Sequence, residues 1–189
     1  MLLRYKALGG ESHQFAMETK FKKALNDKYN IDFECFASPI NSYYTKYCSL
    51  FYDIDKYFGS FGNYYLVKYN RGFYIANPPY EPYMLKLMVN KFIESCKNTN
   101  EKLLISFGLP NWGNNPAKYG KFEAIDIARK TKYLEFERCM KNGEVWWYDR
   151  TNNHRIKIPS HCRFIIGNEK SDILKDEFND LINKYWIPK

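Results

Sequence analysis

The sequence predicts an α/β fold in which helices flank a central sheet. Short apolar runs that suit strands alternate with amphipathic segments that suit helices, and this alternation is typical of α/β domains. The chain has 189 residues, which is the length of one domain and is enough to bury roughly 70% of the unfolded surface. No internal repeat or long linker divides it, so we expect residues 1–189 to form a single domain.

The first elements are expected to be short. Residues 17–26 have helical spacing, with Phe21 and Leu25 on one face. An apolar run at 33–37 ends at a Ser-Pro step, which predicts a strand followed by a break. The remaining elements up to residue 69 are a helix at 41–51 that turns Tyr44, Cys48 and Phe51 inward, a loop at 58–63 and a strand at 64–69.

The middle of the chain carries the clearest pattern. A strand at 72–76 leads into a Pro-Pro turn, and a helix at 81–97 follows it. An apolar run at 102–107 predicts a buried strand that ends at a Gly-Leu-Pro-Asn-Trp turn. The helical stripe at 81–97 consists of Leu85, Met88, Val89, Phe92 and Ile93.

The last third repeats the alternation. Its final helix, at 171–185, begins at a serine cap and carries apolar residues at helical spacing. That apolar face consists of Ile173, Leu174, Phe178, Leu181 and Ile182. The elements expected before this helix are a loop at 114–119, a helix at 122–131 and strands at 134–138, 145–148 and 163–166.

The composition limits the classes of function. Lys and Arg number 29 against 21 Asp and Glu, and the net charge of +8 suits an anionic partner such as RNA. The aromatic content of 19% excludes a disordered chain, and the sequence contains no run of about 18 apolar residues that would predict a membrane span. Residues 1–10 lack the pattern of a signal peptide. We therefore expect an intracellular protein of the cytoplasm or nucleus. The residue bias is that of an AT-rich genome, such as that of an intracellular parasite or of a large DNA virus whose protein acts in the host cell.

The cysteines and histidines do not form the pattern of a metal site. The five cysteines are widely spaced, with no Cys-x-x-Cys pair. The three histidines show no zinc-binding spacing, and scattered structural histidines are the simpler interpretation. We therefore expect neither a disulfide framework nor a bound metal.

The Pro-Pro turn is the segment that points to chemistry. Asn77-Pro78-Pro79-Tyr80 follows a predicted strand, and this [Asn/Asp/Ser]-Pro-Pro-aromatic pattern is found in enzymes that methylate exocyclic or amide nitrogens. The exocyclic amine of adenine is a poor nucleophile, because its lone pair is delocalised into the ring. Two acceptors for its N–H groups can localise that lone pair on the nitrogen. The Asn77 side-chain oxygen and the Pro78 carbonyl would serve, held by the stiff proline pair, while Tyr80 offers a stacking face. A structural turn that caps a strand is the alternative.

Further motifs accompany this tetrapeptide and carry a resemblance. Glu34-Cys35-Phe36-Ala37-Ser38-Pro39-Ile40-Asn41 precedes it, Phe58-Gly59-Ser60 lies between, and Arg-Tyr-Lys-Ala-Leu-Gly-Gly at 4–10 with His13-Gln14 lies upstream. Pro110-Asn111-Trp112 ends the next strand. Together these motifs, from about residue 4 to residue 168, resemble the catalytic domain of the phosphorylated-CTD-interacting-factor family, the cap-specific adenosine N6-methyltransferase of mRNA.

The resemblance implies a fold, a cofactor and a partner. It implies a Rossmann-like class I methyltransferase sheet with flanking helices, S-adenosylmethionine as the cofactor and RNA as the substrate, with the adenosine next to the mRNA 5' cap as the target. The run at 34–39 is also similar to the Glu-Pro-Phe-x-Gly motif of DNA adenine methylases, which holds the methionine end of the cofactor. On this similarity we expect Phe36, Ala37, Ser38 and Pro39 to contact the cofactor, with a buried strand end as the alternative. Glu34 and Asn41, at the two ends of the longer run at 34–41, are further cofactor-binding candidates.

Other positions follow by analogy with the same folds. Asp53 and Asp55 are candidates for the ribose hydroxyls of the cofactor, like the acid that follows the second strand of such sheets. Solvated loop carboxylates are the alternative interpretation. Trp112 would wall the nucleotide pocket together with Tyr80, although a core tryptophan needs no function. The cofactor or the incoming base would be covered by Phe58, Gly59 and Ser60.

Two departures from the family change the expectation. The family enzyme carries an additional helical region and an N-terminal WW module, and we expect this chain to lack both, so that recognition of the cap needs a protein partner. About forty residues separate the cofactor motif from the catalytic motif, so we expect a trimmed sheet. The alternatives in function are a DNA adenine methyltransferase, a protein glutamine methyltransferase, and an inactive methyltransferase fold that serves as an RNA-binding or scaffold subunit.

Overall fold

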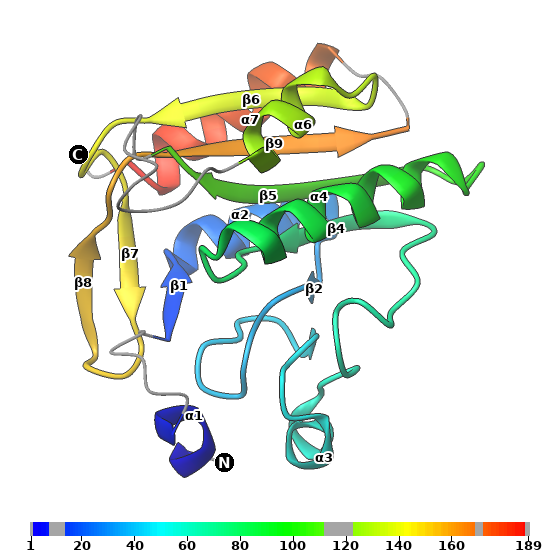
Figure 1. The fold of residues 1–189 in the computed structure, drawn as a ribbon. Helices are drawn as coiled ribbons and strands as arrows, with labels where there is room; N and C mark the ends of the chain where they lie inside the picture. The colour runs from blue at the N-terminus through cyan, green and yellow to red at the C-terminus, as the bar shows by residue number, and fades with distance from the viewer. Residues whose placement is uncertain (1, 8–13, 112–122, 169–171, 188–189) are drawn as a thin grey trace.

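The computed structural model describes residues 2–7, 14–111, 123–168 and 172–187 (Figure 1). Its helices are α1 (Leu2–Ala7), α2 (Thr19–Tyr29), α3 (Tyr52–Asp55), α4 (Pro82–Lys97), α6 (Glu123–Lys130) and α7 (Asp172–Tyr185), with a 3-10 turn η1 (Lys56–Phe58). Its strands are β1 (Phe15–Met17), β2 (Phe33–Glu34), β3 (Lys46–Tyr47), β4 (Gly72–Ala76), β5 (Leu103–Pro110), β6 (Leu134–Met140), β7 (Trp146–Asp149), β8 (His154–Lys157) and β9 (His161–Gly167).

The main sheet is mostly parallel. Within the described residues it has six strands in the order β3-β2-β4-β5-β9-β6. The first four run parallel to one another, and β9 lies antiparallel between β5 and β6. The chain passes from β2 outward to β3 on one side and from β4 outward to β5 on the other, so the strand order reverses between β2 and β4. This arrangement confirms an α/β fold.

Helices cover both faces of the main sheet (Figure 1). One core lies between the sheet and the pair α4 and α6, where Met88 and Phe92 meet Phe107. The other lies between the sheet and the pair α2 and α7, where Phe21 and Phe178 belong to the same cluster. Because strand side chains alternate between the two faces, successive residues of each strand enter different cores.

A second, antiparallel sheet in the order β1-β7-β8 stands at one end of the main sheet (Figure 1). Trp186, just beyond α7, donates its indole N–H to the Trp146 carbonyl at 2.9 Å, and its ring lies 5.9 Å from that of Trp147. The backbone N–H of Asn111, which follows β5, donates to the Ser160 carbonyl at 2.9 Å. The small sheet therefore borders the carboxyl end of β5.

Most predicted elements are confirmed, with shifted ends. The strand at 72–76 and the helix at 81–97 correspond to β4 and α4, and the other elements from residue 102 onward correspond to β5, α6, β6, β7, β9 and α7. The helix at 17–26 begins at Thr19, because Met17 belongs to β1. The strand at 33–37 is shortened to β2. The loop predicted at 114–119 lies outside the described residues.

The predicted helix at 41–51 is wrong. The segment contains β3, whose neighbour Cys48 donates its backbone N–H to the Glu34 carbonyl at 2.9 Å and accepts from Ala37 N at 2.9 Å. These cross-strand bonds use the groups that a helix would pair internally. Tyr44 and Cys48 are still buried, because the segment packs against β2.

The predicted strand at 64–69 is also wrong, because the segment forms turns. Tyr64 and Tyr69 are both buried, with ring centroids 5.3 Å apart, and the Tyr64 hydroxyl donates to the Met88 carbonyl at 3.3 Å. Leu66 is 82% exposed. Aromatic packing under α4 therefore replaces strand pairing.

One pair of cysteines is bonded, although the sequence predicts no disulfide framework. Cys139 and Cys162 are directly paired residues of β6 and β9 with Cα atoms 3.9 Å apart, and they form a disulfide. Antiparallel pairing brings together two cysteines that are 23 positions apart in sequence, which spacing alone does not reveal. Cys35, Cys48 and Cys96 are free and buried. Over the described part of the chain, no helix combines the length and the apolar character needed to cross a membrane.

Candidate active site

The predicted catalytic motif leaves the sheet beside the predicted cofactor motif. Glu34 of β2 pairs with Ile75 of β4, and the Cys35 N–H donates to the Ile75 carbonyl at 2.7 Å. The segments 34–41 and 77–80 therefore begin at the same carboxyl edge. This edge is where the strand order reverses, which is the position where open α/β sheets bind ligands.

Asn77 is held by an arginine from β9. The Arg163 Nη1 donates to Asn77 Oδ1 at 2.7 Å and to the Ala76 carbonyl at 3.4 Å. Its Nε donates to Ser106 Oγ at 2.9 Å and its Nη2 to the Ser106 carbonyl at 3.2 Å. The Arg163 side chain is fully buried. Burial lowers the pKa of Arg163 to about 9, which still leaves it charged at neutral pH.

The sheet explains how this arginine reaches the motif. Arg163 lies two residues before Ile165, which belongs to the core under α2 and α7, so both side chains project on that face. Gly108 is the residue of β5 paired with Arg163. A Cβ at Gly108 would lie 3.3 Å from Arg163 Nη1 and 3.6 Å from the Tyr80 hydroxyl. The glycine therefore leaves room for the guanidinium and the tyrosine to meet.

The rest of the tetrapeptide is partly open. Pro78 is buried, Pro79 is exposed, and Tyr80 is half-buried against the core under α4. Burial raises the pKa of the Tyr80 hydroxyl, so this group stays protonated at neutral pH. Glu81 then caps α4, because its carboxylate accepts the first free backbone N–H groups of the helix.

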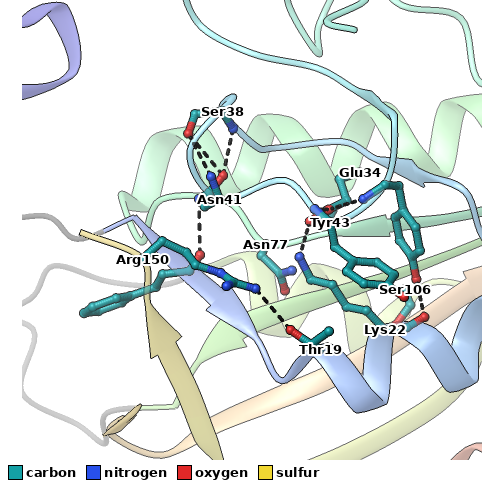
Figure 2. Close-up of polar contacts among 12 residues, drawn as sticks. Thr19, Lys22, Glu34, Ser38, Asn41, Tyr43, Asn77, Ser106 and Arg150 are labelled. Atoms are coloured by element: carbon teal, nitrogen blue, oxygen red, sulfur yellow. Dashed lines mark hydrogen bonds and ion pairs between the residues drawn. The ribbon is translucent and has the colours of Figure 1, made fainter. Parts of the chain in front are cut away.

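The segment after β2 forms a tight turn (Figure 2). Asn41 Oδ1 accepts from the Ser38 N–H at 2.7 Å, and Asn41 Nδ2 donates to the Phe15 carbonyl at 3.3 Å. The Ser38 hydroxyl donates to Gln14 Oε1 at 2.6 Å, which joins two motifs of the resemblance. Phe36 stacks on Tyr64 with ring centroids 4.4 Å apart. The turn is thus fixed from both sides, and Ala37 and Pro39 within it are half-buried.

Glu34 has protein partners on both carboxylate oxygens. Its Oε2 lies 2.6 Å from Lys22 Nζ, and its Oε1 accepts from the Tyr43 N–H at 2.6 Å and the Tyr44 N–H at 3.2 Å (Figure 2). The Lys22 and Glu34 side chains are 1% and 4% exposed. The Glu34 carboxylate therefore holds the 41–44 loop through the backbone N–H groups of Tyr43 and Tyr44.

The two aspartates predicted for the ribose hydroxyls lie in different environments. Asp53 is 61% exposed and forms an ion pair with Arg4 at 2.6 Å. Asp55 is fully buried, and its Oδ2 accepts from the Tyr5 hydroxyl at 2.5 Å. Its Oδ1 is buried without a hydrogen-bond partner among the described residues. Burial and the Asp55 hydrogen bond raise the pKa of the Tyr5 hydroxyl, so Tyr5 is the donor. Asp55 thus retains an acceptor for a hydroxyl group.

The segment 58–60 closes against β3. Gly59 has φ +101°, and a Cβ there would lie 2.3 Å from the Thr45 carbonyl oxygen, so only glycine fits. Ser60 bridges to Tyr47, and its hydroxyl lies 2.6 Å from that of Ser49. Phe58 is 55% exposed and available to a ligand.

Trp112, predicted to wall the nucleotide pocket, lies outside the described residues. A cavity of about 970 Å³ lies at the opposite, amino edge of the main sheet, where Phe33, Gly72 and Lys102 begin or precede their strands. The segments at 34–41 and 77–80 contribute no residue to its lining. The chemistry-bearing motifs therefore gather at the carboxyl edge and not at this cavity.

Sequence reasoning missed Arg163 and Lys22. One signal was present for Arg163: a charged residue inside the apolar run Cys-Arg-Phe-Ile-Ile, which belongs to a buried strand. Lys22 lies in α2 next to the predicted inward residue Phe21, so its burial has no such signal. Both cations lie on the α2 and α7 side of the main sheet, where they reach the ends of β2 and β4.

The family comparison covers most of the chain. A family model described as the phosphorylated CTD interacting factor 1 WW domain matches residues 1–142. In this structure the described part of that region contains β1 to β6, α1 to α4 and α6. The match therefore includes most of the main sheet and all of the tetrapeptide, and β9 lies beyond it.

Two curated relatives carry an enzymatic name. The Homo sapiens protein named mRNA (2'-O-methyladenosine-N(6)-)-methyltransferase is 35% identical over 107 residues, which is 57% of this chain. The Mus musculus protein of the same name is 34% identical over 107 residues, again 57% of this chain. The matched region spans 15% of the length of each relative.

Proposed function

The chain belongs to the phosphorylated CTD interacting factor 1 WW domain family, and we propose that it is an S-adenosylmethionine-dependent methyltransferase of adenine N6 in RNA. Asn77-Pro78-Pro79-Tyr80 at the reversal point of the main sheet is the observation that carries the proposal. The names of the human and mouse relatives support mRNA as the substrate. The target that we propose is the adenosine next to the 5' cap, with a protein partner completing cap recognition.

The topology supports a class I methyltransferase sheet that has been trimmed. Residues 35–71 are all described, and they contain only α3 and η1 as helices between β2 and β4. The sheet is otherwise closed by β9, which lies antiparallel between β5 and β6. The shortened connections leave the end of β2 close to the end of β4.

The chain's own residues support cofactor binding. The unpaired Asp55 Oδ1 is a buried acceptor that suits a ribose hydroxyl. The fixed turn around Ser38 and Asn41 would receive the methionine end, and Phe58 would cover the ligand. When bound, S-adenosylmethionine supplies an electrophilic methyl group with its own leaving group. The protein therefore has to bind, orient and desolvate the amine, and no acid–base pair is required.

We assign the orienting role to Asn77 and Pro78. The Asn77 Oδ1 and the Pro78 carbonyl oxygen would accept the two N–H bonds of the adenine amine, which localises its lone pair on the nitrogen that attacks. The Pro78-Pro79 pair and the Arg163 contact hold these acceptors before substrate arrives. Tyr80 would stack on the base after it has left its neighbours.

A methyl-transfer assay tests the proposal. The protein is incubated with labelled S-adenosylmethionine and with capped RNA, uncapped RNA, duplex DNA or a glutamine peptide, and the products are digested and identified by mass spectrometry. We expect N6-methyladenosine from RNA that begins with adenosine. Asn77→Ala should abolish transfer while calorimetry still detects cofactor binding. Transfer to DNA or to the peptide alone would replace the RNA assignment, and absence of cofactor binding would favour an inactive scaffold.

A further inference from the structure

Arg163 is a buried cation without an ionic partner. Among the described residues it forms no ion pair, and four of its five N–H groups donate to Ser106 Oγ, the Ser106 and Ala76 carbonyls and Asn77 Oδ1. A buried guanidinium without an anion is costly, and an apolar side chain in β9 would avoid that cost. Packing of the sheet therefore does not by itself explain why an arginine lies here.

The hydrogen bond from Arg163 fixes which end of the Asn77 amide faces the arginine. A guanidinium has only donors, whereas a carboxamide has an acceptor oxygen and a donor nitrogen. Only Oδ1 of Asn77 can therefore face Arg163, and Nδ2 has to point away. In the described part of the chain, Nδ2 has no hydrogen-bond partner. The oxygen keeps a second lone pair, so Asn77 presents one acceptor and one donor in a fixed arrangement.

We propose that Arg163 is a positioning residue that locks the Asn77 amide in this orientation and thereby selects a base that pairs a donor amine with an acceptor ring nitrogen. The inference rests on the proposed function and adds a basis for its choice of base. Adenine offers the N6 amine as a donor and a neighbouring ring nitrogen as an acceptor, which matches Oδ1 and Nδ2 of Asn77. A base with a carbonyl at that position matches only the reversed amide.

Inosine is the matched probe for this idea. It differs from adenosine by a carbonyl in place of the amine and by a proton on the adjacent ring nitrogen. If the Asn77 amide were reversed, its Nδ2 would donate to the inosine carbonyl and its Oδ1 would accept from the ring N–H. This pairing is equivalent to that of the locked amide with adenosine. The loss of the lock should therefore appear as a loss of discrimination between the two nucleosides, whether or not turnover survives.

The experiment measures the affinity of the full chain for two RNAs. They are identical except for adenosine or inosine at the target position, and S-adenosylhomocysteine is present to prevent turnover. We expect the unsubstituted protein to prefer adenosine by about tenfold or more. Arg163→Met should lower the ratio severalfold, while the Pro78 carbonyl, which also accepts from the amine, keeps a residual preference for adenosine. Ser106→Ala leaves the Arg163 charge in place but removes the hydroxyl that accepts from Arg163 Nε. This variant should lower the adenosine preference only partly.

Two controls separate an orienting role from a structural one. In an Asn77→Ala background, Arg163→Met should change the ratio by less than twofold, because the residue through which it acts is gone. Melting and cofactor affinity are measured on the same samples. If Arg163→Met does not fold, Ser106→Ala and Arg163→Lys, which cannot bridge both partners, carry the test.

An unchanged adenosine preference in every folded variant would overturn the role of Arg163. A loss of melting temperature and cofactor affinity in proportion, with no change in the ratio, would make the arginine structural and would also overturn it. Failure of the unsubstituted protein to methylate or bind any RNA counts instead against the proposed function, so the two failures are distinguishable.

Discussion

Lys22 Nζ lies 2.6 Å from Glu34 Oε2, and the two side chains are 1% and 4% exposed. The pair joins α2 to the end of β2, directly below the loop that follows the cofactor motif. Burial lowers the pKa of Lys22, while the carboxylate of Glu34 raises it. The Glu34 carboxylate therefore opposes part of the effect of burial on the Lys22 pKa.

Removal of one partner should therefore be costly. Lys22→Met leaves Glu34 buried without its ionic partner, and we expect a loss of about 3–5 kcal/mol of unfolding free energy in urea. Adding Glu34→Gln should restore much of this loss, because the amide oxygen still accepts from Tyr43 and Tyr44. Lys23→Met is the control: its pair with Asp27 is exposed and screened by solvent, so its loss should change stability far less. Equal losses for Lys22 and Lys23 would contradict the prediction.

His161 should make stability depend on pH. Burial, with a contribution from Arg163, lowers the pKa of His161 to about 3, from 6.5 in the unfolded chain. Between these values the unfolded state binds the additional proton, so stability falls as the pH falls below about 6.5 and should lose about 1.4 kcal/mol per pH unit from this group. His161→Phe should flatten this dependence, whereas replacing the exposed His154 should not. Urea unfolding at several pH values between 4 and 7 provides the measurement.

The aspartates allow a matched test of the cofactor site. Asp55→Asn should weaken S-adenosylmethionine binding by roughly tenfold to a hundredfold, because the amide leaves a single acceptor oxygen for the Tyr5 hydroxyl and the ribose hydroxyl. Asp53→Asn, only two residues away but exposed and paired with Arg4, should change the affinity by less than about twofold. Calorimetry on both variants decides. A larger effect at Asp53 would move the ribose to the other carboxylate.

Tyr80 should act through its ring. Tyr80→Ala should reduce kcat/KM on an adenosine-initiated RNA by about tenfold to a hundredfold, because base stacking on an aromatic side chain is worth roughly 1–3 kcal/mol. Tyr80→Phe keeps the ring and should retain most of the activity, although the hydroxyl lies beside Gly108 and Arg163. Equal damage in the two variants would show that the hydroxyl, and not the ring, is the important group.

The elements that the sequence predicted well have local causes. The helix after the tetrapeptide begins where Glu81 caps it and Pro82 occupies its first turn, and both signals are visible in the sequence. In the segment 41–51, the helical spacing of Tyr44 and Cys48 predicts a helix. The segment instead forms β3, because it pairs with β2, and no residue within the segment indicates this pairing.

The residues of the candidate site also fall into those that local motifs predict and those that depend on distant parts of the chain. Asn77, Ser38 and Asn41 lie in contiguous motifs, so sequence analysis found them together with their neighbours. Arg163 reaches Asn77 from 86 positions away, and Lys22 reaches Glu34 from another layer of the fold. Such partners depend on which strands become neighbours, and that information is distributed over the whole sheet.

The position of β9 has a consequence for the synthesis of the protein. A ribosome completes β5 and β6 before it produces β9, which has to enter between them. Until residues 161–167 emerge, the nascent chain holds two strands with unpaired edges, and every residue of β5 is destined for burial. Truncated or stalled chains should therefore aggregate and depend on chaperones, and they should also lack the arginine that holds Asn77.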